Sequence, residues 1–259
     1  MLLAVDVGNT QTVIGMFDRD KLDQHWRIGS QADRTADEWA LIFQGLLSQV
    51  GLSFGRSVTS VVISSVVPRV TQALRDMTER YFFFEPLVVG PGVRTGLSIH
   101  TDNPKEVGAD RVVNAIAAFT RHGGPCIVID FGTATTFDAV SEKGEYLGGA
   151  IAPGIEIATN ALVSGAAQLR NIEFVEPRSV IGKTTVEAIQ SGVLYGFAGQ
   201  VEGIVTRMRE ELGTHAPAVA TGGLATVIMP LTKAIDHHDP WLTLEGLRLI
   251  YERNSERDA

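Results

Sequence analysis

The stretch "AVDVGNTQTVIGMFD", residues 4–18, opens with an apolar run that is typical of a β-strand and ends at Asp6. Gly8, Asn9 and Thr10 follow, and a second apolar run begins at Thr12. This pattern fits a β-hairpin. A strand that ends on a carboxylate and a glycine also suits a loop that holds phosphate, because glycine lets backbone N–H groups approach an anion closely. Taken alone, the stretch fits both readings.

The same pattern returns in the second half of the chain. Residues 127–136, "IVIDFGTATT", align with residues 3–12 at an offset of 124, as from Asp6 to Asp130. The polar turn at 142–144 keeps this offset from the turn at 18–20, and a third strand is predicted after each. Two strand meanders with the same opening turn predict two similar lobes around a pseudo-two-fold axis, with a cleft between them.

Strands alternate with helices in both halves, which predicts an α/β fold with a parallel crossover in the first half. Residues 90–107 are rich in Gly, Pro, Asn and Asp and separate the halves, so we expect an N-terminal lobe at 1–107 and a C-terminal lobe at 108–259. The predicted strands after the first meander are 57–65, 86–89 and 217–221, and the predicted helices are 36–47, 68–80, 108–121, 155 onward, 185–212 and 241–253.

The composition of the chain limits the kinds of binding partner that we expect. The net charge is −8, with 30 acidic and 22 basic side chains and no run of five like charges, which argues against nucleic-acid binding. No apolar stretch approaches the roughly 18–20 residues that span a bilayer, and no signal peptide is recognised. Cys126 is the only cysteine, so an intramolecular disulfide is impossible. We therefore expect a cytoplasmic protein without membrane partners.

The two glycine turns are the candidate phosphate sites. Gly8 and Gly132 each follow a predicted strand, and the Asn and Thr residues beside them add donors. Asp6 and Asp130 repel phosphate directly, but each suits a metal ion that bridges phosphate oxygens.

A second candidate lies at the start of the helix predicted from Gly108. Asp110 and Arg111 would lie in its first turn, where acidic residues are also favoured for purely structural reasons. Beside a cleft, an aspartate can accept a proton from an alcohol and an arginine can hold an anionic substrate. Both readings stay open on these residues alone.

Two other patterns are set aside. Gly182-Lys183-Thr184-Thr185 resembles the end of a P-loop, but Pro177 stands where that motif needs glycine, and no strand precedes it. His237-His238 is predicted to lie in an exposed loop. The remaining histidines show no ligand spacing, so no zinc site is expected.

Four glycines lie within the predicted helix 185–212, at positions 192, 196, 199 and 203. Their spacing places them along one helical face. This face predicts either close helix packing within the chain or a contact between two copies in a dimer.

The paired Asp-x-Gly turns resemble the superfamily of acetate kinase, sugar kinases, Hsp70 and actin, whose two duplicated ribonuclease H-like lobes clamp ATP. Within it, four motifs together resemble type III pantothenate kinase over essentially the whole chain. They are Asp6 to Thr10, Gly108 to Arg111, Asp130 to Thr133, and Gly148 to Gly154. The resemblance implies an enzyme that phosphorylates pantothenate with ATP in the first step of coenzyme A synthesis. It also implies a homodimer that needs magnesium and a monovalent cation, potassium or ammonium.

The resemblance also implies roles by position. Asp110 matches the catalytic base, and Asp130 matches the ligand of the monovalent cation, while Asp6 is a candidate magnesium ligand. The pantothenate-binding residues matched are Gly108, Ala109, Asp110, Arg111 and Thr185. The ATP-binding residues matched are Asp6, Val7, Gly8, Asn9, Thr10, Gln11, Thr12, Val13 and Thr133.

One position departs from the family pattern, since Thr101 stands where many members have a tyrosine near the substrate. Two alternatives to a pantothenate kinase remain. The first is a related kinase with another small hydroxyl substrate, which should lack the Gly-Ala-Asp-Arg segment. The second is a non-catalytic accessory regulator of transcription, against which the retained Asp6, Asp110 and Asp130 argue.

Overall fold

The computed structural model describes residues 1–164 and 172–255, which form two compact units. Unit 1 contains Met1–Leu97, Asn103–Ala117 and the described residues from Leu242 onward, and unit 2 contains Ser98–Asp102 and the described residues of Ala118–Trp241. Each unit is therefore discontinuous in sequence, whereas the predicted lobes 1–107 and 108–259 have a single boundary. That division of the chain stays a prediction.

Unit 1 is built on a five-stranded sheet with the order β3-β2-β1-β4-β5. The first three strands form an antiparallel meander, and β4 and β5 continue the sheet in parallel from β1. The predicted meander and parallel crossover are therefore confirmed. The strands are β1 (Leu2–Val7), β2 (Gln11–Asp18), β3 (Lys21–Gly29), β4 (Ser60–Ser65) and β5 (Leu87–Val88).

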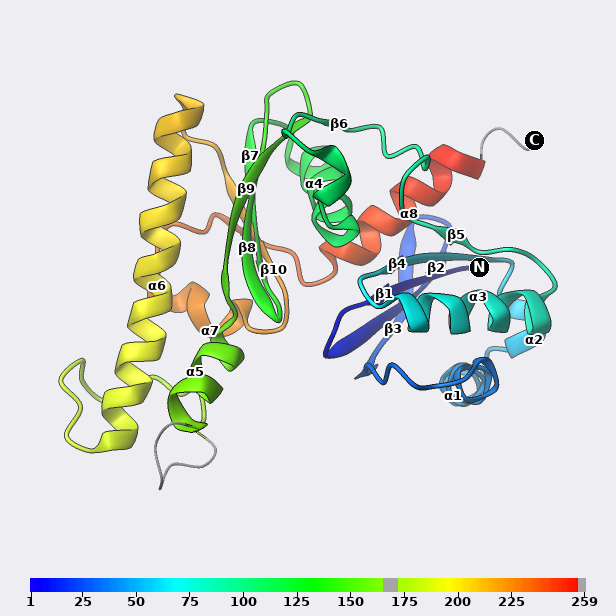
Figure 1. Ribbon diagram of the computed structural model, residues 1–259, viewed down its shortest axis with the longest axis horizontal. Helices are drawn as coiled ribbons and strands as arrows, with labels where there is room; N and C mark the ends of the chain where they lie inside the picture. Colours follow the sequence, from blue (N-terminus) through cyan, green and yellow to red (C-terminus); the bar gives the residue numbers. More distant parts are fainter. Residues whose placement is uncertain (165–171, 256–259) are drawn as a thin grey trace. The chain divides into compact units, whose positions relative to one another are not determined.

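Helices cover both faces of this sheet (Figure 1). Val5 and its alternate neighbours in β1 join a buried core with α1 and α3. Gly15 points to the opposite face, where a Cβ would lie 2.7 Å from Leu244 of α8. The helices are α1 (Ala36–Gln49), α2 (Phe54–Ser57), α3 (Pro68–Phe82), the 3-10 turn η1 (Pro104–Glu106), the first part of α4 (Ala109–His122), and α8 (Leu242–Ser255).

Unit 2 repeats this architecture around a six-stranded sheet with the order β11-β10-β7-β8-β9-β6. Read from β9 to β11, the order matches β3-β2-β1-β4-β5 of unit 1, strand for strand. The predicted duplication is therefore confirmed. The strands are β6 (Ser98–Ile99), β7 (Cys126–Phe131), β8 (Ala134–Val140), β9 (Glu145–Pro153), β10 (Ala218–Thr221) and β11 (His237–His238).

The two copies differ by one residue in the turn after their first strand. In unit 1 Val7 pairs with Thr12, whereas in unit 2 Phe131 pairs with Thr135. Thr135, and not Thr136, thus occupies the place of Thr12, and both side chains are fully buried. The constant offset of 124 is therefore wrong across this turn, since the second turn is shorter.

The long helix α6 (Thr185–Leu212) has the bounds that the sequence predicts, and Figure 1 shows it running alongside the sheet of unit 2. Thr184 caps its start by accepting a hydrogen bond from the Glu187 backbone, and Gly213 ends it in the left-handed region. The segment that resembles a P-loop is therefore a helix cap. The other helices are α5 (Ile155–Ser164), α7 (Ala225–Ile228), the 3-10 turn η2 (Met229–Leu231), and the end of α4.

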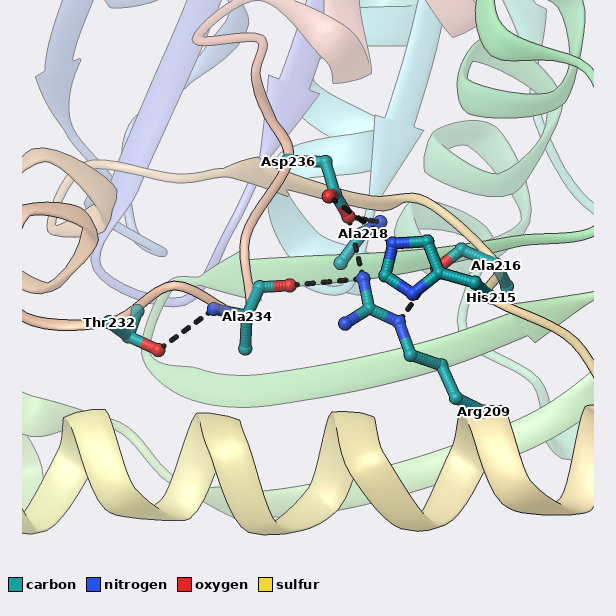
Figure 2. A network of polar contacts seen from close by, with 7 residues as sticks. All are labelled: Arg209, His215, Ala216, Ala218, Thr232, Ala234 and Asp236. Carbon is teal, nitrogen blue, oxygen red and sulfur yellow. Dashed lines mark hydrogen bonds and ion pairs between the residues drawn. The ribbon is translucent and has the colours of Figure 1, made fainter.

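Arg209 fixes the C-terminal end of α6 to the sheet (Figure 2). Its guanidinium donates to the carbonyl oxygen of Ala216 at 2.9 Å and to the Asp236 carboxylate at 2.6 Å. Asp236 also accepts from the backbone N–H of Ala218, the first residue of β10, at 2.7 Å. One ion pair thus joins the helix end, the start of β10 and the segment before β11.

Candidate active site

The first phosphate turn is a closed loop at the end of β1. The Gly8 N–H donates to the Gln11 carbonyl oxygen at 3.0 Å, and the Thr10 carbonyl accepts from the Ser30 N–H at 2.9 Å. The buried Thr12 hydroxyl and the Ser30 hydroxyl lie 2.8 Å apart. A Cβ on Gly8 would approach the Gln11 oxygen to 3.1 Å. The base of the loop is thus fixed, while Asn9 and Thr10 stay exposed at its tip.

Asp6 lies directly before this turn and is half-buried. It pairs with Val13 of β2 and with Ser64 of β4, so its side chain shares the sheet face that α8 covers at Gly15. Magnesium is usually held by one or two carboxylates together with phosphate oxygens. A single carboxylate at the strand end, beside an exposed turn, fits such a site.

Asp110 is the second residue of α4, and it is half-buried. Its Oδ1 accepts a hydrogen bond from the Arg111 N–H at 2.9 Å. A Cβ on Gly108 would lie only 2.5 Å from that oxygen, so glycine is needed for the carboxylate to take this position. Asp110 and the first phosphate turn belong to the same compact unit, although about 100 residues separate them in sequence.

The second phosphate turn lies in unit 2, at the end of β7. Gly132 donates to the Ala134 carbonyl at 3.1 Å, and the Thr133 carbonyl accepts from the Gly154 N–H at 3.2 Å. Gly132 and Thr133 are exposed, and Asp130 before them is half-buried. The turn therefore repeats the first one, with a fixed base and an open tip.

Two glycines that the sequence prediction did not assign pack against this second turn. A Cβ on Gly154 would lie 2.3 Å from the Thr133 carbonyl oxygen. At Gly222, whose φ is +91°, a Cβ would lie 2.5 Å from Asp130 Oδ1. The clusters Gly148–Gly154 and Gly222-Gly223 were the available signal, but only the three-dimensional structure shows that both clusters reach the turn.

Thr185 is the first residue of α6 and is exposed. Glu187 holds the segment before it, because its carboxylate accepts from Arg178 at 2.7 Å and from the Lys183 N–H at 3.0 Å. These hydrogen bonds, that of Arg178 first, lower the pKa of Glu187. Thr185 therefore projects from a helix start that its own neighbours stabilise.

The predicted site residues thus fall into two sets. Unit 1 contains Asp6–Val13 and Gly108–Arg111, and unit 2 contains Asp130, Thr133 and Thr185. Within residues 1–164 and 172–255, no group of three or more His, Cys, Asp or Glu side chains is arranged to hold a metal ion. None of the helices in that part of the chain has the length and hydropathy to cross a membrane.

Solved structures with little sequence similarity share this fold. A Campylobacter jejuni protein provisionally named a Baf family transcriptional activator aligns with a TM-score of 0.63 at 18% identity, covering 98% of this chain and 99% of its own. The ROK hexokinase of Thermus thermophilus aligns with a TM-score of 0.53 at 13% identity, covering 98% and 99%. Together with the repeated strand order, these likenesses confirm the predicted fold of two duplicated ribonuclease H-like lobes.

Other relatives have a much higher sequence identity to this chain than these solved structures have. The type III pantothenate kinase of Streptomyces griseus subsp. griseus is 56% identical over 264 aligned positions, which cover 99% of this chain and all of the relative. That of Moorella thermoacetica is also 56% identical, covering 98% of this chain and all of the relative. The family model for type III pantothenate kinase matches residues 2–207. This chain is therefore a member of the type III pantothenate kinase family.

Proposed function

We propose that this chain transfers the γ-phosphoryl group of ATP to pantothenate, which gives 4'-phosphopantothenate in the first step of coenzyme A synthesis. The observation that carries the proposal is the presence of the first phosphate turn and Asp110 in one compact unit of a chain 56% identical to named pantothenate kinases. Phosphoryl transfer is mainly positioning and charge stabilisation, so a phosphate-binding turn and a base held by the same unit supply its main requirements.

ATP supplies the transferred group, and the backbone of the two turns would hold its phosphates. In the first turn, residues Asp6 to Val13 present the exposed tip at Asn9 and Thr10. In the second turn, Thr133 is the exposed contact. The close packing of Gly154 against Thr133 leaves no room for a side chain at position 154, so glycine is needed for this segment to pack against the second turn.

Pantothenate would be held by Gly108 to Arg111 and by Thr185. The guanidinium of Arg111 suits the carboxylate of the substrate, and Asp110 would orient the reacting hydroxyl and accept its proton. The position of Asp110 in the first helical turn also places it near backbone N–H groups that have no partner within the helix.

Two cations complete the proposed site. Asp6 would hold magnesium at the phosphates, and Asp130 would hold potassium or ammonium, with its carboxylate oxygen beside the backbone of Gly222. ADP release measured after magnesium chelation, and with sodium in place of potassium, tests both assignments. Unchanged rates of ADP release in both conditions would contradict both cation assignments.

The enzyme is further proposed to be a cytoplasmic homodimer. The support for the dimer is the face of α6 at Gly192, Gly196 and Gly199, which is exposed and has open space around it.

Replacement of Asp110 by Asn tests the role of the base. The amide keeps the size of the side chain but cannot accept the proton, so kcat is expected to fall by roughly 10²–10⁴-fold, the usual contribution of a positioned base. The measurement is pantothenate-dependent ADP release in a coupled assay, with the fold checked by circular dichroism.

Asp37→Asn is the matched control. Asp37 is also the second residue of a helix in unit 1, and its carboxylate pairs with Arg80 at 2.8 Å. If Asp110 were only a favourable acid in a first turn, both variants would keep their turnover and lose only stability. Equal turnover in the two folded variants would therefore contradict the role of Asp110.

A further inference from the structure

The C-terminal helix α8 contacts α4 one helical turn after Asp110. Asn114 lies four residues after Asp110 and Val113 three residues after it, so both lie one turn further along the same side of α4. The Thr243 hydroxyl of α8 donates to Asn114 Oδ1 at 2.7 Å. Asn114 is only 1% exposed, and its partner Thr243 is half-buried.

The backbones of the two helices are also in close contact. A Cβ on Gly246 of α8 would lie 2.2 Å from the Val113 carbonyl oxygen. Any side chain at position 246 would therefore push the helices apart. The hydrogen bond of Thr243 and the close approach of Gly246 fix α4 at the turn that follows Asp110.

The other side of α8 packs on the sheet that carries the first phosphate turn. It contacts β1, β2 and β4, and Leu244 reaches Gly15 of β2. Gly15 pairs with Ala4, two residues before Asp6. At the far end of the helix, Asn254 exchanges two hydrogen bonds with the Arg94 backbone, at 3.1 and 3.0 Å. Helix α8 is thus held at both ends and lies between the sheet and α4.

We propose that Thr243 is a positioning residue for phosphoryl transfer: through Asn114 it sets the position of Asp110 relative to the first phosphate turn. The proposal rests on the role of Asp110 as the base. It concerns a helix that lies beyond the residues 2–207 matched by the family model. Since α8 packs both on α4 and on the sheet that ends in the first phosphate turn, small movements of α4 on α8 change the distance between Asp110 and that turn.

The test is Thr243→Val, which keeps the shape of the side chain and removes the hydroxyl. A misplacement of about 1 Å can cost about 10²-fold in rate, so kcat is expected to fall by about 10- to 100-fold. The KM for ATP should stay unchanged, because the phosphate turn is untouched. Thr243→Ser restores the hydroxyl and should restore kcat. If Thr243→Val does not fold, Thr243→Ala removes the hydroxyl without leaving a second methyl group in the contact.

Thr78→Val is the matched control for a purely structural effect. Thr78 is fully buried in α3 of the same unit, and its hydroxyl donates to the Leu74 carbonyl at 2.7 Å. Its replacement should lower the melting temperature but leave kcat unchanged. Wild-type kcat in folded Thr243→Val, or an equal loss of kcat in Thr78→Val, would overturn the proposal.

The double variant Asp110→Asn, Thr243→Val separates this proposal from the one on which it rests. If Thr243 acts through Asp110, its replacement should cost little further kcat once the base is gone. High activity in Asp110→Asn alone would defeat the role of the base. Low activity in Asp110→Asn together with wild-type activity in Thr243→Val would defeat only the positioning role. Fully additive losses would also contradict it, because they would show that Thr243 acts independently of Asp110.

Discussion

His122, at the end of α4, lies in a contact that disfavours its charged form. Its ring stacks on that of His237 with the centroids 4.4 Å apart, and its Nε2 is buried with no hydrogen-bond partner among the described residues. Burial lowers the pKa of His122, and the nearby His237 and Arg121 lower it further, while Asp239 opposes them. The folded protein therefore binds a proton at His122 less readily than the unfolded chain does.

This contact predicts a loss of stability in acid. Because the unfolded chain takes up the proton near the ordinary pKa of 6.5, the free energy of unfolding should decrease as the pH falls below about 6.5, until the folded protein also binds the proton. His122→Gln removes the titrating group and should flatten this part of the pH profile, measured by urea denaturation. His238→Gln, at an exposed neighbour on β11, is the control. An unchanged slope in His122→Gln would refute the assignment.

Among the helices, α6 has a glycine-lined face that does not pack against the described part of unit 2. Among residues 1–164 and 172–255, Cβ atoms built on Gly192, Gly196 and Gly199 would meet no atom within 4 Å, and one on Gly203 would meet only the Arg207 guanidinium, at 3.3 Å. Close packing within the chain, one of the two explanations for the glycine pattern, is therefore wrong for the first three positions. A smooth face that contacts no other described residue of its own unit supports the proposed contact with a second copy.

Light scattering tests this reading of α6. The wild-type protein is expected to have about twice the chain mass of 27.9 kDa, and Gly196→Arg should give the monomer mass because a long charged side chain blocks close approach. Gly45→Arg, at an exposed glycine of α1 that also has open space around it, should leave the mass unchanged. A wild-type monomer at micromolar concentration, or a dimeric Gly196→Arg, would contradict the assignment.

The sequence predicts the long elements well, but it misses two of the shortest strands. The bounds of α6 and the capping box of α1, in which Thr35 and Glu38 bond to each other's backbone, follow from local chemistry. Strands β6 and β11 have two residues each, too few to show any periodicity. Thus the histidines at 237–238 are exposed as predicted but form a strand instead of a loop. The shorter second turn escaped prediction because Thr135 and Thr136 are chemically identical, so the alignment placed the wrong one opposite Thr12.

For the chain as a whole, the duplication is what the sequence reveals most directly. One repeated Asp-x-Gly turn predicts two units with the same strand order, and it identifies Asp6 and Asp130 as equivalent positions. The contacts of Gly222 with Asp130 and of Thr243 with Asn114 could not be predicted. They join residues about 90 and 130 positions apart, and no local pattern records such pairs.

Phosphoryl transfer to pantothenate is tested most directly by ADP release from ATP, measured with and without pantothenate. The proposed function predicts that ADP release depends on pantothenate and that one 4'-phosphopantothenate forms for each ADP. Equal ADP release without pantothenate would point to a different acceptor. The absence of ADP release from the folded protein, with magnesium and potassium present, would contradict the assignment as a kinase.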